Sequence, residues 1–188
     1  MVEPALHEPQ YFYPMHSGPF TPEDRARMPE DKRRVELLDG ALLVSPAPGM
    51  AHNEMVMHLF RLLDRSCPPG VTIYNVPYDY RLPDDSELIP DISVMRREDL
   101  GPKRITKPPL LVVEVLSPSS RLIDPLVKRV KYEAAGVPAY WVADPVAPRL
   151  TVLELESGRY VERAVLDGGA GEVVLHRPYD VTVHLRLP

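Results

Sequence analysis

The pattern of apolar and polar residues predicts a strand hairpin near the start of the chain. Residues 34–38 and 41–45 are short runs rich in Val and Leu, and Asp39-Gly40 between them favours a tight two-residue turn. Upstream, Thr21-Pro22 followed by two acidic residues predicts a short helix that ends near residue 28. Residues 1–20 are rich in proline and aromatic residues, and we expect an extended arm there.

The spacing of the apolar residues becomes helical over residues 51–65. The residues that recur at this spacing are Met55, Leu59, Leu62 and Leu63. Alternation typical of a strand returns over residues 71–82, and a second, short strand is expected over residues 91–95. Residues 96–109 predict a connecting loop with about one helical turn.

The most apolar segment, residues 110–116, is the expected centre of the sheet, buried on both faces. A helix over residues 125–135 follows, with Asp124 as its N-cap and Gly136 as its stop. The next strand covers residues 139–143. A helix between two buried strands forms a crossover, so the sequence predicts that these two strands are parallel.

The fold class predicted from these elements is α/β, with a mixed sheet and helices on its faces. Residues 149–155 and 159–166 predict a second hairpin, and residues 173–187 predict one or two closing strands. We expect a single domain over residues 1–188, in which 1–30 form the arm and short helix, 33–166 the core and 167–188 the closing strands.

The composition is that of a globular cytoplasmic protein. No apolar stretch approaches the roughly 20 residues of a membrane span, and the first residues do not resemble a signal peptide. A single cysteine, Cys67, excludes an internal disulfide and a cysteine-based zinc site. The chain has 23 prolines and only three amide side chains, Gln10, Asn53 and Asn75, a bias that predicts thermostability.

The net charge of −5 argues mildly against nucleic acid as a partner, because phosphate binding draws on Lys and Arg. Bound divalent cations would offset several of the acidic residues, so the argument is not decisive. Basic clusters, each of which is read most simply as a solvated surface, lie at residues 32–34, 96–97, 103–104 and 128–131.

Two carboxylates stand where the predicted sheet is apolar. Glu114 lies within the central strand, where a charge is costly unless it is compensated, and Asp91 begins a neighbouring strand. Two carboxylates on adjacent strands repel each other, and a divalent cation relieves that repulsion. Pairing of the buried glutamate with Arg or Lys is the alternative. We favour the metal site.

Two further ionisable residues are expected near this pair. Glu36 lies on the early hairpin between apolar residues, and Lys128 lies on the helix that follows the central strand. Asp and Glu oxygens suit Mg²⁺ or Mn²⁺, and a nearby lysine can orient water and neutralise a phosphate. His52, at a helix start, could contact the site or a phosphate, and a capping or surface role is the equal alternative. Lys131 is a weaker substitute for Lys128.

The spacing of these residues resembles a known nuclease signature. Pro90-Asp91, a gap of 22 residues and then Glu114-Val115-Leu116 is similar to the motif of the PD-(D/E)XK nuclease superfamily. One branch, the Uma-type restriction endonuclease family, is similar over residues 33–166. Its further matching stretches are Glu36 to Gly40, Ser45-Pro46 with His52, Glu114 to Ser120, Asp124, Lys128, Tyr132, Gly136 to Pro138 and Tyr140 to Asp144.

The resemblance implies a restriction-endonuclease-like core with Asp91, Glu114 and the backbone carbonyl of Val115 as metal ligands. Glu36 matches an acid that the superfamily often contributes from an early element. Leu116 stands where the superfamily motif has its lysine, and Lys128 on the next helix matches the displaced lysine.

The leading hypothesis is a Mg²⁺-dependent endonuclease that hydrolyses DNA phosphodiester bonds with metal-activated water. The alternative is an inactive nuclease-fold module that binds nucleic acid or protein, and a third possibility is an ion-pair network without a ligand. Because cutting both strands of a duplex usually takes two sites, we also expect a homo-oligomer, at least a dimer.

Overall fold

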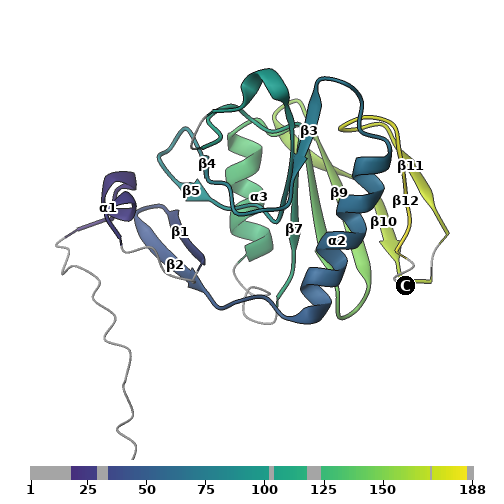
Figure 1. The fold of residues 1–188 in the computed structure, drawn as a ribbon, viewed down its shortest axis with the longest axis horizontal. Helices are drawn as coiled ribbons and strands as arrows, with labels where there is room; N and C mark the ends of the chain where they lie inside the picture. Colours follow the sequence, from purple (N-terminus) through teal and green to yellow (C-terminus); the bar gives the residue numbers. More distant parts are fainter. Residues whose placement is uncertain (1–17, 29–33, 102–103, 118–123, 170, 186–188) are drawn as a thin grey trace, which may run out of the picture.

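The computed structural model describes residues 18–28, 34–101, 104–117, 124–169 and 171–185 (Figure 1). The helices are α1 (Pro22–Ala26), α2 (Met50–Arg65) and α3 (Asp124–Ala134), with a 3₁₀ turn η1 (Arg97–Asp99). The strands are β1 (Arg34–Leu38), β2 (Ala41–Ser45), β3 (Val71–Tyr74), β4 (Tyr80–Arg81), β5 (Glu87–Leu88), β6 (Ile92–Arg96), β7 (Leu111–Val115), β8 (Ala139–Asp144), β9 (Arg149–Glu156), β10 (Arg159–Asp167), β11 (Val173–Leu175) and β12 (Val181–Val183).

The main sheet, as far as the structure describes it, has six strands in the order β10-β9-β8-β7-β6-β3. The strand pair β7–β8 is parallel and the other neighbours are antiparallel. Since α3 connects β7 to β8, the predicted crossover and the predicted mixed α/β sheet are both confirmed. The helix begins at Asp124 itself, one residue earlier than predicted.

The two faces of this sheet carry separate cores. On β7, Val113 and Val115 pack against α2, whereas Val112 packs on the other face with Tyr132 of α3. Figure 1 shows the two helices on opposite sides of the sheet, with β11 and β12 beside α2. Because side chains alternate along a strand, Glu114 shares the α3 face with Val112.

The early hairpin belongs to a second sheet, of order β2-β1-β5-β4, and not to the main sheet. The prediction of one continuous strand over residues 71–82 is wrong. Residues 71–74 pair with β6 of the main sheet, and residues 80–81 pair with β5 of the second sheet. Pro77 lies between the two, where a residue without an N–H interrupts a ladder of backbone hydrogen bonds.

The ends of the chain differ in how far the structure tests them. Most of the predicted arm, residues 1–17, lies outside the described residues. The cap of α1 is as predicted, since the backbone N–H of Asp24 donates to Thr21 Oγ1 at 3.2 Å. The strands β11 and β12 pair with each other, and Val181 and Val183 pack in the α2 core. Within the described ranges, no helix combines the length and apolarity needed to cross a membrane.

We predict that Gly40→Ala lowers the free energy of unfolding more than Gly158→Ala does. Both glycines have positive φ, 77° and 79°, so each substitution carries the same backbone cost of about 1–2 kcal/mol. At Gly40 an added Cβ would lie 2.4 Å from Pro19 Cβ, whereas the space at Gly158 is open. Overpacking adds roughly 1–3 kcal/mol, and equal losses in urea denaturation would contradict this account.

Candidate functional site

Glu114 is held by two side chains from one face of α3. Lys128 Nζ lies 3.3 Å from Glu114 Oε1 and 3.2 Å from Oε2. Tyr132, one helical turn later, donates its hydroxyl to Glu114 Oε1 at 2.7 Å. The alternation of β7 therefore turns its single acidic residue toward a lysine and a phenol, and not toward aliphatic side chains.

The second sheet adds Glu36 to this cluster. Lys128 Nζ also donates to Glu36 Oε1 at 3.0 Å, so one ammonium group bridges carboxylates from two different sheets. The same Glu36 oxygen accepts the backbone N–H of Ile89 at 2.7 Å. Lys128, Glu36 and Glu114 are 1%, 3% and 4% exposed, so these three charged side chains are buried together.

Asp91, the residue immediately before β6, also belongs to the cluster. Ile92 pairs with Val113 in the antiparallel ladder, which brings the preceding residue, Asp91, beside Glu114 and Val115. The backbone N–H of Val115 donates to Asp91 Oδ2 at 2.7 Å. The same carboxylate lies 2.6 Å from Arg34 Nη1 and 3.2 Å from His52 Nε2.

Arg34 is the site residue that the sequence analysis missed. Its guanidinium contacts Asp91, and its Nη2 lies 3.6 Å from Glu36 Oε1 and 3.7 Å from Glu114 Oε2. It also donates to the carbonyl of Ile89. The sequence pattern predicts that Arg34 belongs to a solvated basic cluster, but residues two apart on a strand share a face. The spacing of Arg34 and Glu36 on one predicted strand was the available signal.

The electrostatics of the cluster are unequal. Burial raises the pKa of Glu114, and the neighbouring Asp91 and Glu36 raise it further, against the opposing charges of Lys128 and Arg34. Burial also opposes ionisation of Asp91, but its hydrogen bond to His52, the charge of Arg34 and the Val115 N–H bring its pKa below the usual range. Asp91 is therefore the firmly ionised carboxylate, and Glu114 holds a proton more tightly.

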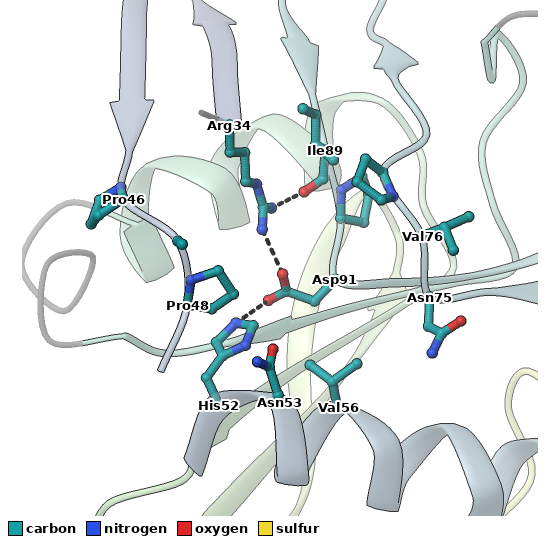
Figure 2. Close-up of a pocket in the computed structure, with 13 residues that line it drawn as sticks. Arg34, Pro46, Pro48, His52, Asn53, Val56, Asn75, Val76, Ile89 and Asp91 are labelled. Atoms are coloured by element: carbon teal, nitrogen blue, oxygen red, sulfur yellow. Dashed lines mark hydrogen bonds and ion pairs between the residues drawn. The ribbon is translucent and has the colours of Figure 1, made fainter. Parts of the chain in front are cut away.

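A pocket of about 390 Å³ opens beside Asp91 (Figure 2). Arg34, His52 and Asp91 stand at its centre, where dashed lines in the figure mark their contacts. The remaining lining residues are Pro46, Ala47, Pro48, Asn53, Val56, Asn75, Val76, Pro77, Ile89 and Pro90. Glu36, Glu114 and Lys128 do not line it, so a molecule in this pocket reaches the cluster through Asp91 and Arg34.

The structure thus brings together Glu36, Asp91, Glu114 and Lys128, the four residues proposed from the sequence. Lys131 lies elsewhere on α3, where its ammonium pairs with Asp39 and Asp84. His52 contacts Asp91, as considered. The predicted metal ligands are occupied by protein cations, because Arg34 pairs with Asp91 and Lys128 pairs with Glu114. This is the buried ion pair that the sequence left as the alternative.

The donor set nevertheless has the chemistry of a site for a divalent cation. Asp91, Glu114 and the Val115 carbonyl offer hard oxygen ligands of the kind that Mg²⁺ and Mn²⁺ prefer. Among the described residues, the buried cluster sets three carboxylates against two side chains of fixed positive charge. The described residues contain no group of three or more His, Cys, Asp or Glu side chains placed to hold a metal. Arg34 Nη1 lies 2.6 Å from Asp91 Oδ1, so a cation on that oxygen would compete with this contact.

The comparison with protein families decides the family. The model of the Uma2 family, described as "Putative restriction endonuclease", matches residues 22–178. The chain belongs to the Uma2 family. This confirms the resemblance found in the sequence motifs, and the match extends beyond the predicted core on both sides. A comparison with curated proteins gives no match.

A solved structure supports the fold. The crystal structure of a putative nuclease of the DUF820 class from Anabaena variabilis is similar with a TM-score of 0.68. The similarity covers 84% of this chain and 89% of that chain, at 18% sequence identity. The Uma2 chain therefore shares the nuclease-like fold of that protein, a mixed sheet flanked by helices, as the sequence predicted.

We predict that Lys128→Met lowers the free energy of unfolding by about 3–5 kcal/mol at neutral pH, because it leaves buried carboxylates without their cation. Lys107→Met is the matched control: that lysine pairs with Asp99 at the surface, where solvent screens the pair, so its loss should leave the free energy of unfolding nearly unchanged. Both values come from urea denaturation.

The same pair of variants gives a pH test. Folding raises the pKa of the Glu114 carboxyl above its ordinary value of 4.5. Such a group destabilises the folded protein once the pH rises above that ordinary pKa. The pKa of Glu114 is raised to about 8 in the parent, and removing Lys128 raises it further, so the loss in Lys128→Met should stay level below about pH 8 and grow as the pH rises above it. A loss that stays the same from neutral pH to well above pH 8 would contradict the assignment of the defect to Glu114.

Proposed function

We propose that this Uma2 protein is a divalent-metal-dependent endonuclease that hydrolyses DNA phosphodiester bonds. The observation that carries the proposal is the cluster of Asp91, Glu114 and Lys128, in which Asp91 lines an open pocket and Glu114 and Lys128 are buried. The family description and the nuclease-like fold support the same reaction class. Metal dependence rests on the donor set rather than on a bound ion.

In this proposal Asp91, Glu114 and the Val115 carbonyl hold Mg²⁺ or Mn²⁺. When bound, the cation polarises the phosphodiester and lowers the pKa of coordinated water, which supplies the nucleophile. Glu36 stays outside this ligand set and keeps Lys128 in place through their contact at 3.0 Å.

Arg34 and Lys128 are the cationic side chains that would stabilise the negative charge of the substrate phosphate. Lys128, fixed between Glu36 and Glu114, keeps a positive charge next to the reacting centre and can orient the attacking water. Arg34 lines the pocket with a side chain that is 26% exposed. A guanidinium forks onto phosphate oxygens, so Arg34 can exchange Asp91 for the substrate phosphate. His52 then remains as the partner that orients Asp91.

We predict that Asp91→Asn and Glu114→Gln abolish Mn²⁺- or Mg²⁺-dependent cleavage of labelled DNA, with at least a roughly 100-fold loss of rate. Each variant removes a ligand charge while keeping the side-chain shape. Glu87→Gln is the matched control, because Glu87 is also a buried acid, 1% exposed, and is paired with Arg25 and Arg104 away from the pocket.

The control should cut DNA at the rate of the parent protein even if it is less stable. Wild-type protein that leaves single-stranded and duplex DNA uncut in both metals would defeat the proposal. The expected homo-oligomer belongs to the same proposal, since cutting both strands of a duplex takes two such sites, and light scattering measures it.

A second function is favoured by one specific observation. Asp91 and Glu114 are already paired with Arg34 and Lys128, and Leu116 stands at the motif position of the lysine. A nuclease-fold module that binds nucleic acid or protein without cutting needs nothing more.

Calorimetric titration of Mn²⁺ separates the two functions. A metal-dependent nuclease should bind the ion with a stoichiometry that Asp91→Asn abolishes and Glu87→Gln preserves. Equal heats in all three proteins, no greater than dilution, would favour the binding module.

A further inference from the structure

The pocket beside Asp91 contains both asparagines of the chain. The whole sequence has only three amide side chains, and two of them, Asn53 and Asn75, line this one pocket (Figure 2). Asn53 follows His52 on α2, and Asn75 follows β3. Asn75 Nδ2 contacts Met57 Sδ at 3.4 Å. The Asn53 amide and the Asn75 amide oxygen are groups of the kind that pair with the donor and acceptor edges of nucleobases.

The walls of the pocket are apolar. Pro46 and Pro48 lie on one side, and Val56 and Val76 lie on the other. Val76 is 55% exposed, so its side chain is accessible to a ligand in the pocket. Such walls offer flat contact to a base face. The volume, about 390 Å³, is at the small end of ligand pockets, which span about 300–1,000 Å³, and suits one nucleotide rather than a duplex segment.

Two polar groups at the inner end of the pocket add capacity for a ligand. His52 is 8% exposed and Asp91 holds its Nε2, but within the described residues its Nδ1 has no hydrogen-bond partner. Within the same residues Arg34 Nε is likewise buried without a partner. Buried polar groups normally find partners, so both groups are explained if a polar ligand completes this end of the site.

We propose that this pocket binds one unpaired nucleotide of the substrate, and that the substrate is therefore single-stranded or locally opened DNA. The base lies between the proline and valine walls with its edge at Asn53 and Asn75, and its phosphate lies toward Arg34 and Asp91. The inference rests on the proposed nuclease function and specifies its substrate class.

The test measures binding, in Ca²⁺ buffer, of a fluorescein-labelled single strand of eight nucleotides by anisotropy. Its probes are the intact strand, the same strand with abasic sites throughout, and the corresponding duplex. The intact strand should bind roughly tenfold more tightly than the other two, because a stacked base contributes where a phosphate alone does not.

The variants locate that preference. Val76→Glu should weaken binding of the intact strand roughly tenfold, and the Asn53→Ala/Asn75→Ala double variant should do the same. Val174→Glu is the matched control: Val174 is 56% exposed on β11, away from the pocket, and it adds the same charge to the protein. It should bind as the parent protein does.

Each outcome decides the point. Equal affinity for intact and abasic strands, tighter binding of the duplex, or equal effects of Val76→Glu and Val174→Glu would overturn the pocket assignment. Cleavage of DNA in Mn²⁺, read separately, would leave the nuclease proposal standing in each of those cases. Absence of both binding and cleavage would overturn the two together.

Discussion

The structure depends on one buried ammonium group, that of Lys128. It lies within 3.3 Å of Glu36 on the second sheet and of Glu114 on the main sheet, and α3 carries it. Burying an ion is costly, and attraction offsets that cost only when the partners are well placed. The contact therefore sets where the second sheet stands against the main sheet: a displaced hairpin would leave Glu36 and Lys128 buried without each other.

The same arrangement places stability in competition with function. In the described cluster the carboxylates outnumber the fixed cations, which is unfavourable for an empty core and favourable for a site that receives a cation. An apolar core of equal volume would be at least as stable. Here a cluster of buried charges lies between two ordinary hydrophobic cores. Functional sites commonly differ from the rest of a fold in this way.

The sequence predicts those features of the structure that depend on interactions between residues close together in the chain. Periodicity alone located β7, α3 and β8, and a charge within an apolar strand marked Glu114, because both signals lie within a few residues. The change of sheet near Pro77 and the role of Arg34 depend on contacts between distant segments: Arg34 meets Asp91 across 57 positions. Local patterning cannot choose among the partners of a surface-like arginine, and only the fold settled that choice.

Under the proposed function, access through Arg34 would explain how a chain of net charge −5 can bind a polyanion. The pocket is lined by one carboxylate, one guanidinium, one imidazole, two amides and otherwise apolar residues, so under the proposal a bound strand would gain more from base contacts than from phosphate neutralisation. An affinity that rests on few phosphate contacts decreases only slightly as the salt concentration rises. The slope of log K against log salt concentration is about −0.7 for each phosphate of a single strand that is neutralised. A net charge of −5 then argues against a long electrostatic groove, not against nucleic acid. The net charge of −5 is consistent with the proposed recognition of one unpaired nucleotide at a time.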